Sequence, residues 1–235
     1  MAIGLKLITA PGSEPVSLAD CKTYLRLASA FTADDTTITN LLYTFRQQCE
    51  LKTGLTLIST VWEQSIDKFP RPRGGGWMYY YPVAPYGYQY DDYLYQDGPA
   101  VVRRDTIELV RSPVTAVASV KYNDTTGTQQ TMDPSTYTVD LTTKPARIAP
   151  AFGTIWPISQ PGIDQIVVRF TAGYTNAAAV LAAVPQAVTW ICAKVDEFYN
   201  NRGASNPNMT GGAMSQTADM VCDSLLDQIS IAAFG

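Results

Sequence analysis

The sequence predicts an α+β fold in which a small helical bundle, built from N- and C-terminal segments, carries an inserted antiparallel β domain and is followed by a C-terminal docking helix. Apolar residues recur at three- and four-residue spacing near both ends of the chain, whereas the middle alternates between apolar and polar residues. We therefore expect a bundle from residues 1–54 and 184–203, with residues 1–16 as a lead-in. A β domain should occupy 55–175, and a linker with a last helix 204–235.

Two helices are expected in the N-terminal part. Ser17 and Asp20 make a capping box, which starts the first helix directly after Ser17. A second, longer helix should be capped by Asp34 or Asp35 and should end at Gly54, because glycine suits the left-handed residue just past a helix. Two short helices cannot bury two apolar stripes alone, so a third helix is needed. The stripe of the second helix comprises Ile38, Leu41, Leu42, Phe45 and Cys49.

The helix with the clearest boundaries lies between Pro185 and Gly203. Proline suits the first turn, where its missing N–H is no loss, and glycine suits the residue beyond the last turn. An Ala-rich bridge precedes it. Trp190 lies nearly opposite its apolar stripe, so we expect this indole either under another part of the chain or against a partner. The stripe comprises Val188, Ile191, Cys192, Val195, Phe198 and Tyr199.

The middle of the chain is rich in Thr, Val and Ile at alternating positions, which is typical of strands. Residues 123–127 and 133–135 have turn chemistry, since Asn, Asp and Gly tolerate positive φ and proline fixes its own. Strands joined by such turns predict an antiparallel sheet or small sandwich inserted in the helical frame. The expected strands are 55–69, 106–110, 114–122, 137–141 and 166–170.

Residues 71–100 form an unusual segment with three consecutive glycines and eight tyrosines. A loop of this length is commonly functional, and Tyr with Gly is the composition of adaptable protein-binding surfaces. We take Trp77 and Tyr79, Tyr80 and Tyr81 as candidate partner-binding residues. The alternative is a long hairpin whose tyrosines cover the outside of the sheet.

Arginines stand at both ends of that segment. Arg71 and Arg73 beside aromatic residues are suited to stack on nucleic acid, but in an acidic protein they more often pair with aspartates or with an adjoining subunit. We include both as candidate contact residues.

The C-terminal part begins with a linker over 204–213, rich in Asn, Gly, Ser and Pro. The last helix carries an apolar stripe, and a helix on such a linker must dock either on its own chain or on a neighbour. Val221, Leu225 and Ile229 of this stripe are therefore candidate contact residues.

Composition excludes several classes of function. The formal charge is −4 and only 16% of residues are charged, so no general basic field draws the chain to nucleic acid or to anionic lipid. No secretory signal or membrane-spanning stretch is present, which predicts a soluble protein made in the cytoplasm. The chain contains no histidine, and this removes the usual general base and the commonest transition-metal ligand.

We find no candidate catalytic, cofactor-binding or metal-ligating residue. The glycines at 74–76 are followed by tryptophan and not by the Lys-Ser/Thr of a phosphate-binding loop. The carboxylates lack the spacing of a cation site or of an acid–base pair, although a pair distant in sequence stays open. Four widely spaced cysteines fall on apolar helix faces, so we expect reduced, buried thiols. These are Cys21, Cys49, Cys192 and Cys222.

The order of these features resembles the head-to-tail connector, or adaptor, family of tailed bacteriophages, in the members that carry a β insertion. The likeness covers about residues 14–203. It is carried by Glu14-Pro15-Val16-Ser17-Leu18-Ala19-Asp20, Glu50-Leu51-Lys52-Thr53-Gly54, Arg111-Ser112-Pro113-Val114, Tyr137-Thr138-Val139-Asp140, Pro145-Ala146-Arg147-Ile148, Trp156-Pro157, Phe170-Thr171-Ala172-Gly173-Tyr174 and Tyr199-Asn200-Asn201-Arg202.

The resemblance implies a virion structural protein and not an enzyme. Such a subunit forms a dodecameric ring beneath the portal protein, receives the next neck or tail protein, and lets DNA pass through its lumen without specific binding. It implies no cofactor and no membrane. Trp190 and Tyr43, which lie off their helix stripes, then become candidates for contact between subunits. The alternative hypothesis is a β-domain binding module of a tail or surface protein, which uses the Tyr-rich segment to bind carbohydrate or protein.

Overall fold

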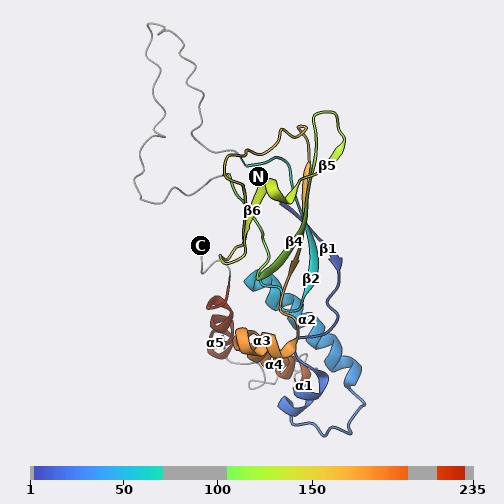
Figure 1. Ribbon diagram of the computed structural model, residues 1–235. Coiled ribbons are helices and arrows are strands. Elements are labelled where there is room, and N and C mark those ends of the chain that lie inside the picture. Colours follow the sequence, from blue (N-terminus) through green and yellow to red (C-terminus); the bar gives the residue numbers. More distant parts are fainter. Residues whose placement is uncertain (1–2, 71–104, 201–215, 231–235) are drawn as a thin grey trace, which may run out of the picture.

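The computed structural model describes residues 3–70, 105–200 and 216–230, and in the last of these ranges the side chains from residue 222 onward. The fold is α+β, as the sequence predicts. The helices gather at one end of an elongated molecule and two antiparallel sheets at the other (Figure 1). We call these two parts the helical body and the sheet body. The Tyr-rich segment, with Arg71, Arg73, Trp77 and Tyr79 to Tyr81, lies outside the described residues.

The helical body has five described helices, and local sequence sets their ends. Ser17 accepts a hydrogen bond from the backbone N–H of Asp20 at 3.1 Å, which confirms the predicted start of the first helix. Gly54 ends the second helix with φ +73°, also as predicted. The helices are α1 Leu18–Tyr24, α2 Asp35–Thr53, α3 Ala177–Ala183, α4 Pro185–Asn200 and α5 Gln216–Asp227.

Two details of the helical body differ from the expectation. The expected Ala-rich bridge is helix α3, whose side-chain cap is Asn176, accepting from the N–H of Ala179 at 2.9 Å. Asp34 does precede α2, but its side chain makes no capping bond. Its carboxylate instead accepts a hydrogen bond from the hydroxyl of Tyr199 at 2.7 Å, and so joins the start of α2 to the end of α4.

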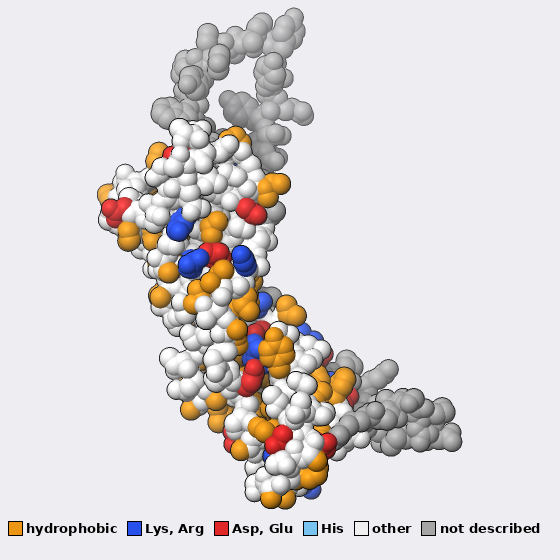
Figure 2. Space-filling view, turned by 90° about the vertical axis from the view of Figure 1, so that its right-hand side faces the viewer, with side chains coloured by type: hydrophobic (Ala, Val, Ile, Leu, Met, Phe, Trp, Pro, Cys, Tyr) orange, Lys and Arg blue, Asp and Glu red, His pale blue; other side chains and the backbone are white. Residues whose placement is uncertain are grey.

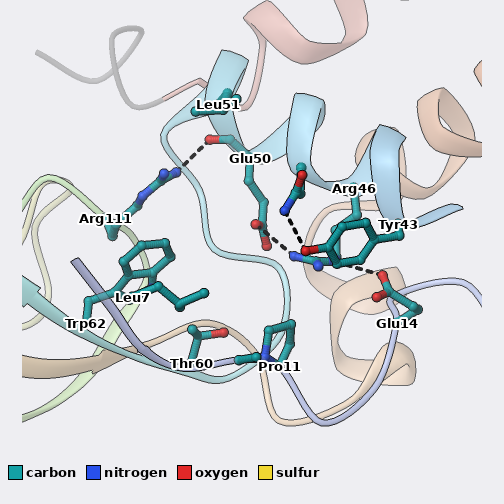
Figure 3. Close-up of a pocket in the computed structure, with 12 residues that line it drawn as sticks. Leu7, Pro11, Glu14, Tyr43, Arg46, Glu50, Leu51, Thr60, Trp62 and Arg111 are labelled. Carbon is teal, nitrogen blue, oxygen red and sulfur yellow. Dashed lines mark hydrogen bonds and ion pairs between the residues drawn. The ribbon is translucent and has the colours of Figure 1, made fainter. Parts of the chain in front are cut away.

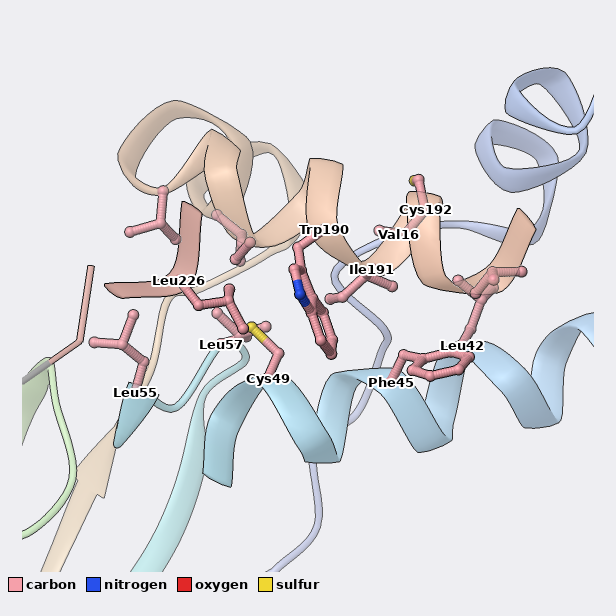
Figure 4. Packing of buried hydrophobic residues seen from close by; sticks show 14 of the residues in the cluster. Val16, Leu42, Phe45, Cys49, Leu55, Leu57, Trp190, Ile191, Cys192 and Leu226 are labelled. Atoms are coloured by element: carbon pink, nitrogen blue, oxygen red, sulfur yellow. The ribbon is translucent and has the colours of Figure 1, made fainter. Parts of the chain in front are cut away.

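The core of the helical body lies between α2 and α4. The expected face of α2 is buried at Ile38, Leu42, Phe45 and Cys49, and it packs against Ile191 and neighbouring residues of α4 (Figure 4). The described cysteines are free thiols; Cys21, Cys49 and Cys192 are buried as expected, whereas Cys222 is only partly buried. Phe198 of the predicted α4 stripe is an exception, because most of its side chain is exposed.

The sheet body contains a five-stranded sheet in the order β1-β2-β8-β4-β5, and a three-stranded sheet in the order β3-β7-β6 covers one face of it. Strand β8 lies at the centre and pairs with β2 along its whole length. The strands are β1 Ile3–Thr9, β2 Thr60–Ile66, β3 Ile107–Glu108, β4 Val114–Asn123, β5 Gln129–Thr131, β6 Tyr137–Asp140, β7 Arg147–Pro150 and β8 Ile166–Ala172.

The N-terminal residues belong to the sheet body, which corrects the expected lead-in over 1–16. Strand β1 pairs antiparallel with β2, from Ile3 opposite Ile66 to Leu7 opposite Trp62. All seven residues of β1 are exposed, because β1 is an edge strand beyond the reach of the covering sheet. Ile3, Leu5 and Leu7 fall on one side of the strand, and this alternation in the sequence was the signal for it.

The predicted strand over 55–69 is regular only over β2. Leu55, Leu57 and Ile58 before it are buried in the helical core and not in the sheet. This segment makes parallel bridges to residue 112 and residue 174, and it carries the chain from one body to the other.

Candidate subunit interface

A hollow of about 310 Å³ opens where the sheet body meets the helical body (Figure 3). Its lining comes from β1, from the segment that follows β1, from α2, from β2 and from the segment between β3 and β4. Sequence-distant segments therefore build it together. The side chains that matter for its chemistry are Leu7, Glu14, Tyr43, Arg46, Glu50, Trp62 and Arg111.

A buried ion network forms one wall of the hollow. Arg46 is buried and donates from Nε to Glu14 Oε2 at 2.7 Å and from Nη1 to Glu50 Oε2 at 3.1 Å. The other carboxylate oxygen of Glu50 accepts from the backbone N–H of Leu57 at 2.9 Å. Glu50 thus ties the last turn of α2 to the segment that leads into β2.

Burial governs the protonation of this network. It raises the pKa of the Glu50 carboxyl, and the hydrogen bond from Leu57 and the positive charges of Arg46 and Arg111 only partly oppose that rise. Burial likewise lowers the pKa of the Arg111 guanidinium, while the charge of Glu50 acts in the opposite direction. Both groups remain part of a charge-balanced set of two carboxylates and two guanidiniums: Glu14, Glu50, Arg46 and Arg111.

Arg111 joins the two bodies from the sheet side. Its Nη1 donates to the backbone oxygen of Glu50 at 2.8 Å, and its guanidinium lies 4.9 Å from the centroid of the Trp62 ring. A planar guanidinium can stack on an aromatic face while donating at its edge, which lysine cannot do. The position of the sheet body on α2 therefore depends on an arginine at this site.

The rim of the hollow is apolar and exposed. Leu51 is 73% exposed, and Tyr43 and Leu7 are about half exposed. Tyr43 is held in place, because its hydroxyl accepts from Gln47 Nε2 at 2.8 Å and its ring lies under the guanidinium of Arg46. Figure 2 shows hydrophobic side chains beside charged ones where the upper and lower parts of the molecule meet. An apolar rim around a neutralised wall is suited to contact with another protein surface.

Comparison with known proteins gives the fold a context. No family model and no curated protein matches the chain. Chains in gene transfer agent (GTA) particles share its fold. A chain in the neck of an empty GTA particle, computed with C6 symmetry, matches with a TM-score of 0.64 and 17% identity over 97% of this chain and 95% of that chain.

Two further GTA structures give the same result. A chain in the virion of a native GTA particle matches with a TM-score of 0.64 and 16% identity over 96% of this chain and 94% of that one. A chain in the neck of a native GTA particle, computed with C12 symmetry, matches with a TM-score of 0.62 and 16% identity over 97% and 94% of the two chains. The shared fold thus extends over nearly the whole of each chain.

The structure changes the role expected for Trp190. This residue is only 1% exposed, so the expectation that it contacts a neighbouring subunit is wrong. Its ring packs edge-on against Phe45 with centroids 6.1 Å apart, and Figure 4 shows the indole directed from α4 toward α2. The indole Nε1 donates to Asp223 of α5 at 3.1 Å. Because α5 packs against both α4 and α2, α4 is buried over a wider arc than one stripe.

The last helix docks on its own chain. Leu226 and Ile229 are buried in the helical core, so the expectation that Ile229 contacts a partner is wrong. Leu225 is partly exposed. The side chain of Val221 lies outside the described residues. Of the candidate contact residues that the structure describes, Tyr43 is therefore the one at the hollow, with Leu225 partly exposed on α5.

Sequence reasoning missed most residues of the hollow. Arg46 and Glu50 lie four apart on the buried side of α2, and a charged pair among apolar residues was a signal for a buried ion pair. The position of Trp62 and Arg111 beside this pair depends on tertiary packing, and no local pattern marks it.

Two further kinds of site concern metal ions and membranes. Among the described residues no cluster of three or more Cys, Asp and Glu side chains is placed to hold a metal ion. Within the same ranges no single helix has the length and apolarity to cross a membrane; α3 and α4 together meet that criterion by length and composition only, and they are bent by 110°.

Proposed function

We propose that this chain is a structural subunit in the neck of a tailed, phage-like particle, where it joins the DNA-filled head to the neck or tail. The observation that carries the proposal is the extent of the shared fold. A chain in the neck of a GTA particle covers 97% of this chain, with 95% of its own length matched. The sequence motifs that resemble phage adaptors independently support the same role in the neck.

The proposed assembly is a ring beneath the portal protein, with the next neck or tail protein on its other side. Two of the similar chains belong to neck structures computed with C6 and C12 symmetry, which fits a closed ring of this chain and supports a dodecamer. The exposed rim at Leu7, Tyr43 and Leu51 offers surface for a neighbouring subunit. The chain would be made in the host cytoplasm and would function in the virion.

We propose a role without catalysis. The chain contains no histidine, and among the described residues no group of Cys, Asp and Glu side chains is placed to hold a metal ion. The formal charge of −4 suits a lumen through which DNA passes without being held. The proposed role therefore depends on shape and on contacts between proteins.

Electron microscopy of the full chain mixed with its portal protein tests the proposal. We expect a ring of this chain on one end of the portal, with 12-fold symmetry as in the neck structure computed with C12 symmetry. The full chain alone is the control, which separates assembly on the portal from association of the chain by itself. If the portal stays bare at saturating concentrations of the chain, the neck role is wrong.

A further inference from the structure

Four of the five most exposed large apolar side chains of the described residues lie in one loop, between β7 and β8. Phe152 is 102% exposed, Ile155 89%, Ile163 81% and Ile158 69%. Scattered exposed leucines on a surface need no explanation, but four large apolar residues within one loop mark a contact surface. We call residues 151–163 the apolar loop.

The apolar loop is fixed to the sheet body. Trp156 in its middle is buried, stacks on Phe69 with centroids 4.8 Å apart, and donates from Nε1 to the backbone oxygen of Asp105 at 2.6 Å. The hydroxyl of Thr154 donates to the backbone oxygen of residue 136, and the N–H of Gln160 donates to the backbone oxygen of residue 123. The exposed side chains are thus presented on an anchored frame, which lowers the entropy lost on binding.

We propose that the apolar loop of one copy of this chain inserts Phe152 into the hollow at the junction of the two bodies in a neighbouring copy. This inference deepens the proposed ring and rests on it, because it names the two surfaces that would join adjacent subunits. A ring of identical subunits needs two different, complementary surfaces on each subunit, whereas a two-fold dimer needs only one. The apolar loop and the hollow are such a pair, one convex and one concave.

Charge favours a second copy as the occupant. The chain carries a formal charge of −4, so two copies repel each other wherever uncompensated carboxylates meet. No ionisable side chain occurs between Arg147 and Asp164, which leaves the apolar loop neutral. The charges in the hollow compensate each other within one subunit. Both surfaces therefore allow acidic copies to approach without like charges facing each other.

The size of the hollow agrees with a single aromatic side chain. About 310 Å³ is too little for an α-helix, whose diameter with side chains is about 10 Å, but it suits one large side chain.

The test uses two variants that each remove one surface. Phe152→Asp removes the loop contact and leaves the hollow intact, and Leu51→Glu blocks the hollow rim and leaves the loop intact. Both positions are exposed, so the fold is preserved. Leu181→Asp, at an exposed leucine of α3, is the matched control. Association is followed by sedimentation velocity, and on the portal ring by electron microscopy.

We expect each variant alone to associate about 30-fold or more weakly than the wild type, as for a hot-spot residue, and the control to be unchanged. A mixture of the two variants retains one intact contact per pair, so it should form dimers that grow no further. If both variants still form rings, or if the mixture yields no dimers, the pairing of loop and hollow is wrong while the ring stands. If the wild type forms no ring on the portal, the proposed function itself fails.

Two other binding partners of the apolar loop would give different results. Binding of the wild type to lipid vesicles, lost in Phe152→Asp, would show that the loop enters a membrane. Rings of Phe152→Asp that fail only to bind the next neck or tail protein would show that the loop meets that protein. Either result overturns the inference.

Discussion

The indole Nε1 of Trp190 donates to Oδ1 of Asp223 at 3.1 Å, and Oδ2 of the same carboxylate binds Lys52 Nζ at 2.8 Å. One side chain of α5 thus joins α4 and α2. The hydrogen bond from Lys52, and secondarily that from Trp190, lowers the pKa of the Asp223 carboxyl.

This carboxylate predicts an acid-sensitive attachment of α5. A depressed pKa means that the stabilisation is complete above the ordinary value of about 3.9 and is lost as pH falls through the lower, folded value. Asp223→Ala should remove this dependence and cost about 1 kcal/mol, whereas Asp223→Asn keeps an acceptor for Trp190 and should cost less. Hydrogen exchange of α5 amides against pH measures both. Equal protection of α5 in the wild type and in Asp223→Ala would contradict the assignment.

Trp190 should contribute to folding. Trp190→Ala creates a cavity between α2 and α4, and it should lower the free energy of unfolding by about 3–5 kcal/mol. Trp190→Phe keeps most of the volume and should cost clearly less. Urea denaturation of both variants gives the comparison. If Trp190→Ala is as stable as the wild type but fails to form rings, Trp190 contacts a neighbouring subunit after all, despite its burial.

Tyr43 should show the opposite behaviour. It lies on the rim, and Tyr43→Ala should change the free energy of unfolding by no more than about 1 kcal/mol, as for an exposed site. Ring formation on the portal should weaken, because the rim loses an aromatic side chain. Denaturation and electron microscopy on the same preparation separate the two effects. The interface assignment fails if Tyr43→Ala assembles like the wild type.

Glu50 should make the free energy of unfolding of the wild type depend on pH. Its folded pKa lies above the unfolded value of about 4.3, so between these values the folded chain binds more protons. The contribution of Glu50 to the free energy of unfolding therefore falls as pH rises through this interval. Glu50→Gln removes that slope. Urea denaturation at pH values from about 4 to about 8 should show the wild type losing stability relative to the variant. A difference that does not vary with pH contradicts this account.

Asp124 organises the turn between β4 and β5. The hydroxyl of Thr126 and then the amide of Gln130, with the backbone N–H groups of residues 126 and 128, lower the pKa of its carboxyl to about 2. Carboxyl NMR titration should find this value, and Thr126→Val should raise it, because the largest of these hydrogen bonds is removed. A wild-type midpoint near the ordinary value of about 3.9 would mean that the turn is open in solution.

Local chemistry in the sequence predicted several elements well. Ser17 and Gly54 marked helix ends because a cap depends on a few adjacent residues, and the turn at residues 123–127 followed from the same kind of signal. The apolar face of α2 was also correct, since helical periodicity reports which side is buried. Such features need no knowledge of distant segments.

Tertiary features were harder to predict. Trp190 lies off the main stripe of α4, and its burial depends on packing against Phe45 of α2 and on the docking of α5. The edge strand β1 pairs with a strand more than 50 residues away. The hollow combines Arg46 on α2 with Trp62 and Arg111 of the sheet body, and sequence spacing carries no record of that proximity.

The course of the chain has a mechanical consequence. Because β1 belongs to the sheet body, the chain passes between the two bodies three times, through residues 10–17, 54–59 and 173–176. Neither body is a continuous piece that could be excised, and no single hinge allows one to swing against the other. A load applied to the sheets is shared by three covalent connections and by the arginine bridge beside them. The subunit should therefore transmit force along its length as one rigid unit.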